Sequence, residues 1–408
     1  GLMDRQAQTA PAAGRRGTVA EVFRVFLGLG LTSFGGPVAH LGYFHASFVV
    51  RRKWLSEQAY ADLVALCQLL PGPASSQVGM AIGLQRAGYM GLLAAWAGFT
   101  LPSAILLVAF AYGASALGAD AGGGWILGLK AAAVAVVAQA VVAMARSLAP
   151  DRERATIAVA GMILAMLVPG ALGQVLVILA GGLAGFLWLR PAPAAEGDHE
   201  GIAVPVGRRT GALFLAAFAV LLFVLPLLAA GTGSPALRMA DGFYRSGALV
   251  FGGGHVVLPL LQAEFVATGF VDKQAFLAGY GAAQAVPGPL FSFAAYLGAA
   301  FRTFPSGITG AGLALVAIFL PSALLVIGSL PFWDRLRRAG MVRRALLGVN
   351  AAVVGLLAAA LYDPVFAEGV TSPASMAIAA ASFVALVAWN APAWAVVILA
   401  GMLGFSVL

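Results

Sequence analysis

The chain of 408 residues is 61% hydrophobic and 10% charged, whereas about a quarter of the residues of a soluble globular domain carry charge, so a soluble domain is excluded. Its net charge of +8 at pH 7 does not indicate nucleic-acid binding, because the basic residues lie mainly in short intervals between apolar blocks, as membrane topology signals do. A single cysteine, Cys67, excludes an intramolecular disulfide and a thiolate metal cluster.

The first predicted segment, residues 1–18, is a cytoplasmic tail that we expect to be disordered, since Arg15-Arg16 lacks the apolar core and cleavage site of a signal peptide. The rest of the chain predicts an all-α polytopic membrane protein, because it contains apolar blocks long enough to cross a bilayer core of about 30 Å. These blocks are 89–113, 124–147, 211–230, 307–330 and 340–362.

Two segments, 19–50 and 57–87, precede the first long block, and a helix breaker divides each of them at its midpoint. The breakers are Gly35-Gly36-Pro37 and Pro71-Gly72-Pro73. Each half has about 14 to 16 residues, or roughly 21–24 Å of helix, which is too short to cross the bilayer core. Two re-entrant helical hairpins therefore explain the pattern better than four stunted spans.

The same motifs return in the second half of the chain, which indicates an internal repeat. The clearest matches are Phe34-Gly35-Gly36 with Phe251-Gly252-Gly253 (there followed by Gly254), Gln68 to Pro73 with Gln284 to Pro289, Leu101-Pro102-Ser103-Ala104 with Leu320-Pro321-Ser322-Ala323, and the segment around Lys130 with that around Asn350. Because the matches keep nearly one offset, we interpret them as a duplication. Repeat one is expected at 19–189 and repeat two at 238–408, with a linker and an unpaired transmembrane helix at 190–237.

The unpaired helix should invert repeat two relative to repeat one, if each repeat crosses the membrane an even number of times. The loop charges agree, because equivalent intervals of the two repeats carry basic residues in one repeat and none in the other. We therefore predict cytoplasmic positions for 51–54, 190–210 and 335–344, and outer positions for 114–123, 231–237 and 363–372.

The broken helices suggest an anion site. A helix that restarts after Pro71-Gly72-Pro73 presents the N–H groups of Ala74, Ser75 and Ser76, and its counterpart after Pro287-Gly288-Pro289 presents those of Leu290, Phe291 and Ser292. Such helix N-termini carry partial positive charge and bind anions. Four broken ends near the midplane would form a site for a small multivalent oxyanion, while the alternative is that the prolines only kink the helices.

The candidate substrate-binding residues are those at the four breaks, together with polar side chains that could support them. They are Gly35, Gly36, His40, Gln68, Pro71, Gly72, Pro73, Ser75, Ser76, Lys130, Gly252, Gly253, Gly254, His255, Gln284, Pro287, Gly288, Pro289, Ser292 and Asn350.

Several of these residues have a second interpretation. Lys130 either serves the site or extends to the membrane interface, since it follows Gly124 closely. His40 and His255 either donate hydrogen bonds, carry a coupling proton or pack as neutral rings. For Arg24 and Arg245 we prefer the interpretation as interfacial anchors to the alternative that they are anion ligands. Three acids near the hairpin mouths could relay protons or simply be solvated: Glu21, Asp241 and Glu264.

Other classes of chemistry find little support in the sequence. There is no Walker A motif, so ATP does not drive this chain directly, and Gly28-Leu29-Gly30 does not complete a dinucleotide fingerprint. His40 and His45 are five residues apart and splay around a helix, which argues against a metal site. We therefore expect no cofactor, no metal and no enzymatic activity.

The glycine turn with His40, the two Pro-Gly-Pro turns and the Phe251 to Gly254 run together resemble the chromate ion transporter family in its long-chain, two-domain bacterial form. The resemblance covers about residues 21–360. It implies a bacterial inner-membrane protein that exports chromate, with sulfate as a structural analogue, and it attaches functional importance to the glycine and Pro-Gly-Pro turns. The residues alone lead only to an anion transporter.

Three hypotheses follow from the residues and the resemblance. The first is secondary active export of chromate, coupled to a proton or a counter-anion. The second is a permease or channel for sulfate or another oxyanion, and the third is a membrane-embedded enzyme such as a chromate reductase. The expected partners are chromate, sulfate, the coupling ion and membrane lipid, while the sequence leaves a homodimer open.

Overall fold

The computed structural model describes residues 17–34, 36–116, 123–190, 205–251 and 253–408. Every regular element in these ranges is a helix, which confirms the predicted all-α class. The tail predicted at 1–18 lies almost entirely outside the described residues. Six of the described helical stretches are long and apolar enough to cross a membrane: Ala74–Ala116, Gly124–Leu148, Ala171–Trp188, Arg208–Thr232, Gly307–Leu336 and Gly340–Gly369.

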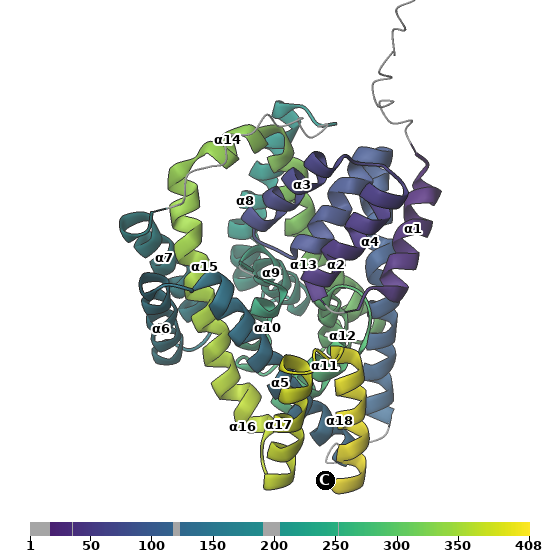
Figure 1. Ribbon diagram of the computed structural model, residues 1–408, viewed down its shortest axis with the longest axis vertical. Coiled ribbons are helices and arrows are strands. Elements are labelled where there is room, and N and C mark those ends of the chain that lie inside the picture. Colours follow the sequence, from purple (N-terminus) through teal and green to yellow (C-terminus); the bar gives the residue numbers. More distant parts are fainter. Residues whose placement is uncertain (1–16, 35, 117–122, 191–204, 252) are drawn as a thin grey trace, which may run out of the picture.

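Repeat one begins with short helices and continues with long ones (Figure 1). Its elements are α1 (Val19–Thr32), α2 (Gly36–Phe44), the π-helix η1 (His45–Arg51), α3 (Glu57–Leu69), α4 (Ala74–Ala116), α5 (Gly124–Leu148), α6 (Arg152–Leu167) and α7 (Ala171–Trp188). Polar caps fix several starts: the Thr18 hydroxyl accepts from the Glu21 N–H at 3.1 Å, and the Ser56 hydroxyl from the Ala59 N–H at 3.2 Å.

Helix α8 (Arg208–Thr232) separates the repeats, and repeat two follows the same order as repeat one. Its elements are α9 (Pro235–Ala248), η2 (Gly254–Val256), α10 (Val257–Leu261), η3 (Gln262–Val266), α11 (Lys273–Ala285), η4 (Leu290–Ser292), α12 (Phe293–Ala300), α13 (Gly307–Ser329), η5 (Leu330–Phe332), α14 (Trp333–Arg338), α15 (Gly340–Ala360), η6 (Leu361–Phe366), α16 (Ala367–Gly369), α17 (Pro373–Val387) and α18 (Ala393–Val407).

Helix α4 contains a sharp reversal that makes it two antiparallel helices. The backbone leaves the helical region at Ala87 and at Gly88, where φ is 68° and ψ is −158°. The two segments pack so closely that a Cβ on Gly83 would clash with the carbonyl oxygen of Gly91. Gly298 on α12 and Gly310 on α13 repeat the same contact, so the close helix pair occurs once in each repeat.

The first two helix pairs are hairpins that begin and end on one face of the molecule. Gly17 at the start of α1 donates its N–H to the Arg86 carbonyl at 3.0 Å, and Arg86 pairs with Glu21 at 3.3 Å. The Arg86 guanidinium also lies 4.7 Å from the ring centroid of Trp54, which stands between the hairpins. The predicted division of 19–50 and 57–87 into broken hairpins is therefore confirmed.

The long span of α4 and its counterpart α13 cross the molecule in opposite directions. The Tyr112 hydroxyl near the end of α4 accepts the Ile308 N–H at 3.2 Å, near the start of α13. Farther along, the Trp96 and Phe319 rings are 5.8 Å apart. Since residue numbers rise along one helix as they fall along the other, the two equivalent spans are antiparallel.

The two repeats exchange their last helices. Helix α5 of repeat one packs against α17 and α18, and α15 of repeat two packs against α6 and α7. Glycines allow both contacts, because a Cβ on Gly128 would clash with the Ala400 carbonyl and a Cβ on Gly348 with the Gly181 carbonyl. Figure 1 shows the resulting arrangement, with α14 and α3 toward one end and α16, α17 and α18 at the other.

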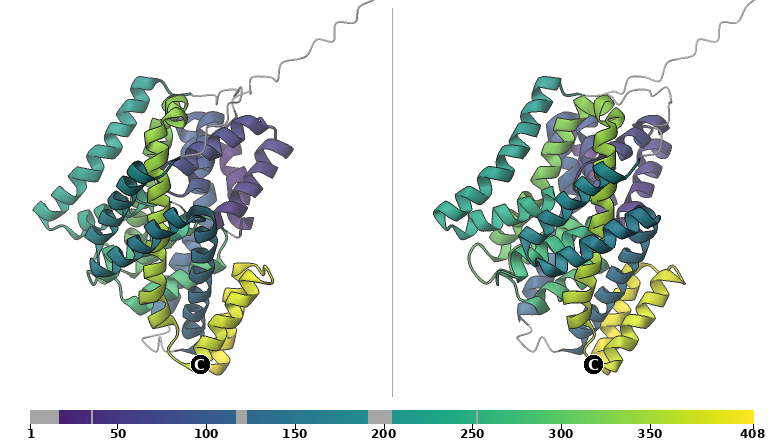
Figure 2. Two further views of the ribbon diagram at one scale, coloured as in Figure 1. Left: turned by 60° about the vertical axis from the view of Figure 1, so that its left-hand side comes forward. Right: turned by 90° about the vertical axis from the view of Figure 1, so that its left-hand side faces the viewer.

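Helix α8 runs along the outside of this assembly and is seen as the long teal helix on one flank in Figure 2. It packs mainly on α9 and α13. Large apolar side chains on its other face are exposed, among them Leu213, Phe223 and Leu227. An exposed face of this composition is suited to lipid.

Candidate functional site

The four breaks in the hairpins meet at the centre of the molecule. The Gly72 N–H of the first Pro-Gly-Pro turn donates to the Val250 carbonyl at 2.6 Å, just before the glycine turn of repeat two. The Gly288 N–H of the second Pro-Gly-Pro turn donates to the Ser33 carbonyl at 2.9 Å, just before the glycine turn of repeat one. Each repeat thus holds the turn of the other with an equivalent backbone hydrogen bond.

The two glycine turns also lie against each other. A Cβ built on Gly254 would stand 3.6 Å from the Pro37 Cγ, so the starts of α2 and η2 are close neighbours. Gly36 has a φ of 80° and Gly253 a φ of 150°, conformations that glycine adopts most readily. Gly35 and Gly252, which were predicted to belong to the site, lie outside the described residues.

The first Pro-Gly-Pro turn is closed by a side chain that the sequence analysis did not single out. The Gln77 side-chain amide donates to the Pro71 carbonyl at 2.8 Å, and the Gln77 N–H donates to the Pro73 carbonyl at 2.9 Å. This backbone bond opens the hydrogen-bond ladder of α4, so the N–H groups of residues 74–76 precede it. The turn itself requires Gly72, whose φ is 123°.

The second Pro-Gly-Pro turn differs from the prediction at Ser292. A tight 3₁₀ turn follows Pro289, and the Ser292 N–H donates to the Pro289 carbonyl at 3.1 Å. Ser292 therefore does not offer a free N–H, because a 3₁₀ turn closes its first hydrogen bond one residue earlier than an α-helix does. The N–H groups of Leu290 and Phe291 precede this bond.

Serines of the repeated Leu-Pro-Ser-Ala motif face the Pro-Gly-Pro turns. The Ser103 and Ser292 hydroxyls are 2.6 Å apart and share a hydrogen bond. Their counterparts in the other half are Ser322 and Ser76, whose hydroxyls are buried and have no hydrogen-bond partner among the described residues. The Ser322 hydroxyl lies beside Gly72, 2.5 Å from the place where a Cβ would stand. Ser103 and Ser292 are therefore hydrogen-bonded to each other, whereas the hydroxyls of Ser76 and Ser322 remain able to donate to a ligand.

Three further buried polar atoms near the turns lack a partner within the described part of the chain. They are the hydroxyls of Ser33 and Thr100 and the side-chain nitrogen of Gln284. Ser33 precedes the glycine turn, Thr100 lies one turn from Ser103 on α4, and Gln284 precedes the second Pro-Gly-Pro turn. Unpaired buried donors are costly, so their concentration here indicates a site for a ligand that accepts hydrogen bonds.

His40 holds the first hairpin in place. Its ring is buried, with Nε2 3.2 Å from the Ser33 carbonyl and Nδ1 3.3 Å from the Ser75 hydroxyl. A carbonyl can only accept, so Nε2 carries the proton and Nδ1 accepts from Ser75. His255 has a comparable contact, with Nδ1 2.7 Å from the Tyr280 hydroxyl. Both rings are thus bound to neighbouring side chains, which favours a positioning role.

The Gln68 side chain is exposed, and two further predicted residues lie away from the set that meets at the turns. Lys130 is buried and interacts electrostatically with Glu368 and Asp272, near the end of the molecule that carries α16. Its counterpart Asn350 lines a cavity elsewhere. The sequence placed Lys130 and Asn350 at equivalent positions, but their surroundings differ.

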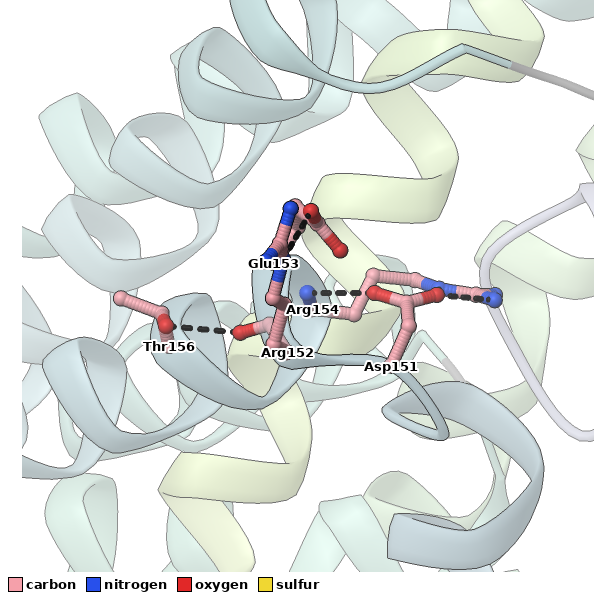
Figure 3. Close-up of polar contacts among 5 residues, drawn as sticks. All are labelled: Asp151, Arg152, Glu153, Arg154 and Thr156. Atoms are coloured by element: carbon pink, nitrogen blue, oxygen red, sulfur yellow. Dashed lines mark hydrogen bonds and ion pairs between the residues drawn. The ribbon is translucent and has the colours of Figure 1, made fainter.

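The cavity lined by Asn350 has a volume of about 590 Å³ and is rich in arginine. Arg154, Arg190 and Arg343 line it, and Leu69 connects it to the residues before the first Pro-Gly-Pro turn. Figure 3 shows its rim at the start of α6, where the Asp151 carboxylate accepts the Arg154 N–H at 2.9 Å. This N–H lowers the pKa of Asp151 below its usual range, so the carboxylate stays ionised and holds Arg154 in place.

Comparison with known proteins agrees with this architecture. A family model described as "Chromate transporter" matches the chain twice, at residues 20–186 and 237–405, which confirms the duplication. The chain is 31% identical over 408 residues to the Chromate transport protein of Pseudomonas aeruginosa, covering 95% of this chain and 92% of the relative.

Two further relatives extend the comparison. The chain is 26% identical to the Probable chromate transport protein of Synechococcus elongatus, over 84% of each chain. It is 24% identical to the Chromate transport protein of Cupriavidus metallidurans, over 84% of this chain and 82% of the relative. No solved structure matches the chain. From the paired family match and the full-length relatives, the chain belongs to the chromate transporter family.

Proposed function

We propose that this protein is a secondary active transporter that exports chromate across the inner membrane of a bacterium. The observation that carries the proposal is the meeting of all four helix breaks, where each Pro-Gly-Pro turn is hydrogen-bonded to the opposite repeat. The names of the relatives, which are chromate transport proteins, support the choice of anion.

The proposed binding site uses neutral donors. Chromate is a tetrahedral dianion whose oxygens accept hydrogen bonds, and the N–H groups of residues 74–76 begin a helix with partial positive charge. The Ser322 hydroxyl lies beside Gly72, and both it and the Ser76 hydroxyl are buried without a partner among the described residues. Neutral donors bind an anion without the strong attraction of a buried cation, which suits an ion that must also leave. Sulfate has the same shape and charge and should compete.

The arginine-lined cavity is the proposed cytoplasmic entrance. Its three arginines, Arg154, Arg190 and Arg343, outnumber its two carboxylates, Asp151 and Glu153, and this positive excess raises the local concentration of a dianion. Leu69 lies on its wall, five residues before Ala74, where α4 starts. Chromate attracted into the cavity is therefore delivered close to the first Pro-Gly-Pro turn.

We also propose that the two repeats have inverted topology, with residues 51–54 and 335–344 in the cytoplasm. The antiparallel course of α4 and α13 supports this orientation, as do the loop charges. Inverted repeats around one central site are suited to alternating access, because each repeat can open the site toward one side of the membrane.

The decisive test is transport by the purified protein in proteoliposomes. Vesicles loaded with unlabelled chromate should accumulate external radiolabelled chromate by exchange, and excess sulfate should reduce the rate. Vesicles without protein and vesicles with Gly288→Val protein are the controls. Absence of exchange by a monodisperse parent protein would contradict the proposed function, and exchange of sulfate alone would move the proposal to a sulfate transporter.

A further inference from the structure

A charged cluster away from the central turns joins the two arms of the first hairpin of repeat two. Arg245 on α9 pairs with Asp241, one turn earlier on the same helix. It also reaches across to Glu264 on η3, with Nε 3.4 Å from Oε1 and Nη2 3.5 Å from Oε2. The side chains of Arg245, Asp241 and Glu264 are only 27%, 11% and 14% exposed.

The cluster has one positive charge for two carboxylates. Around Glu264, the facing charged groups are Arg245 and Asp241, both on α9, while α7 contributes Gln174 and α10 contributes Leu260 to the small cavity beside it. One guanidinium cannot fully balance two partly buried carboxylates, and like charges close together favour a shared proton. One of the two carboxylates can therefore bind a proton.

Two unpaired polar atoms point to the same conclusion. The Gln174 side-chain oxygen and the Ser246 hydroxyl line this cavity, are buried, and have no partner among the described residues. Gln174 is 8% exposed, and its oxygen is an acceptor that needs a donor. An ionised carboxylate cannot donate, whereas a protonated one can. Protonation of the cluster would thus add a donor beside the Gln174 oxygen, an O–H that an ionised carboxylate cannot offer.

We propose that Asp241 and Glu264 form a proton-binding site that couples proton movement to transport of the anion. The proposal rests on the proposed function, since it adds the coupling ion to the same transport cycle. Protons entering while chromate leaves would both carry positive charge inward, so an inside-negative membrane potential would drive the exchange.

The link from this cluster to the anion site runs along α9. The Leu249 N–H donates to the Arg245 carbonyl at 3.1 Å, and the next residue, Val250, accepts the Gly72 N–H. Neutralising Glu264 weakens its attraction to Arg245 and so loosens the contact between α9 and η3. A shift of α9 would then move Val250 and, through the hydrogen bond from the Gly72 N–H to the Val250 carbonyl, the first Pro-Gly-Pro turn.

Repeat one does not contain the cluster. Aligned on Phe34 and Phe251, its corresponding positions hold Arg24, Gly28 and Ser47 in place of Asp241, Arg245 and Glu264. Within the described residues the cluster therefore occurs in repeat two, in the hairpin whose tip holds the first Pro-Gly-Pro turn. Glu21 in repeat one, which pairs with Arg86 and is more exposed, provides a matched control.

The experiment uses the full chain in proteoliposomes containing a fluorescent pH indicator. Chromate moving down its gradient should carry a measurable opposite proton flux in the parent and in Glu21→Gln. Glu264→Gln should keep chromate–chromate exchange within about twofold of the parent and lose at least tenfold of the chromate-dependent proton flux. Asp241→Asn should show the same separation, so it decides the question if Glu264→Gln is not monodisperse.

The outcomes separate the inference from the proposed function. A parent that does not exchange chromate contradicts the function itself. A parent that exchanges chromate without proton flux overturns only the coupling site. Proton flux that persists in both carboxyl variants, or that falls equally in Glu21→Gln, also overturns it.

Discussion

Gly288 shows how a single missing side chain shapes the site. Its φ is 94°, and a Cβ would stand 3.0 Å from the Ser103 hydroxyl and 3.2 Å from the Phe99 carbonyl. Any β-branched residue there is strained by the backbone and crowds the opposite repeat. The Pro-Gly-Pro turn thus needs glycine for conformation and for close approach together.

We expect Gly288→Val to abolish chromate transport while the protein still reaches the membrane in near-normal amount. Gly312→Val on α13 is the control, because a Cβ there meets nothing within 4 Å. Exchange rates in proteoliposomes and the amount of protein in membranes are the measurements. Full transport by Gly288→Val would show that the turn is only a packing kink.

The two serine pairs should respond differently to the same substitution. Ser76→Ala removes a hydroxyl that has no partner in the described structure, so we expect weaker chromate binding, by roughly 1 kcal/mol or about fivefold, and little loss of stability. Ser292→Ala removes the hydrogen bond to the Ser103 hydroxyl, which keeps only the Thr100 carbonyl as a partner, so we expect lower stability by a similar amount.

Equilibrium binding of chromate and thermal unfolding of the purified variants measure the two effects separately. A third variant, Ser76→Asp, puts a carboxylate at the start of α4, where acidic side chains are favoured, and should exclude the anion. Tight chromate binding by Ser76→Asp would place the anion elsewhere.

The helices of this protein pack through matched glycines. Gly128 on α5 and Gly348 on α15 occupy equivalent positions, and a Cβ on either would clash with the backbone of a terminal helix from the other repeat. The contacts are symmetric even though the helices are not neighbours in sequence. Close backbone packing of this kind is the usual source of helix association in lipid.

Gly128→Val and Gly348→Val should therefore destabilise the protein by similar amounts, about 1–3 kcal/mol each. Gly113→Val is the control, since its Cβ would meet nothing within 4 Å. Thermal unfolding in detergent, followed by loss of monodispersity, reports the difference. A variant as stable as the control would mean that the terminal helix can move aside at no cost.

For the individual helices, the sequence predicted where the hairpins break better than it predicted the hydrogen bonds between the two repeats. Proline and glycine fix where the hairpins break, so 35–37 and 71–73 could be predicted from local chemistry alone. The Ser103–Ser292 bond and the Gly72–Val250 bond join residues far apart in sequence, and only the packing of one repeat on the other creates them.

The two repeats match the same family model but carry different charges. The arginine-lined cavity has Arg154, Arg190 and Arg343 on its walls, whereas the cavity beside Ala285, before the second Pro-Gly-Pro turn, is lined largely by apolar side chains. Equivalent parts of the two repeats therefore carry different surfaces. The family resemblance identified the substrate class, which the residues alone could not do.

Membrane topology is tested with single cysteines in a Cys67→Ala background. Ser115 and Met341 are exposed and lie in intervals predicted to face opposite sides. An impermeant maleimide added to intact cells should label Ser115→Cys and leave Met341→Cys unmodified until the membrane is opened. The same labelling at both positions would contradict the inverted arrangement.

The exchange of terminal helices between repeats also governs how the protein is made. Helices α6 and α7 are synthesised long before residues 340–360, which form α15, their partner in the other repeat. Until α15 has been synthesised, the surfaces of α7 at Gly181 and Gly185 lack the helix against which they pack in the folded protein. Repeat one cannot reach its final packing while the ribosome is still producing repeat two. Assembly of this molecule is therefore completed only near the end of synthesis, when the last helices find α5.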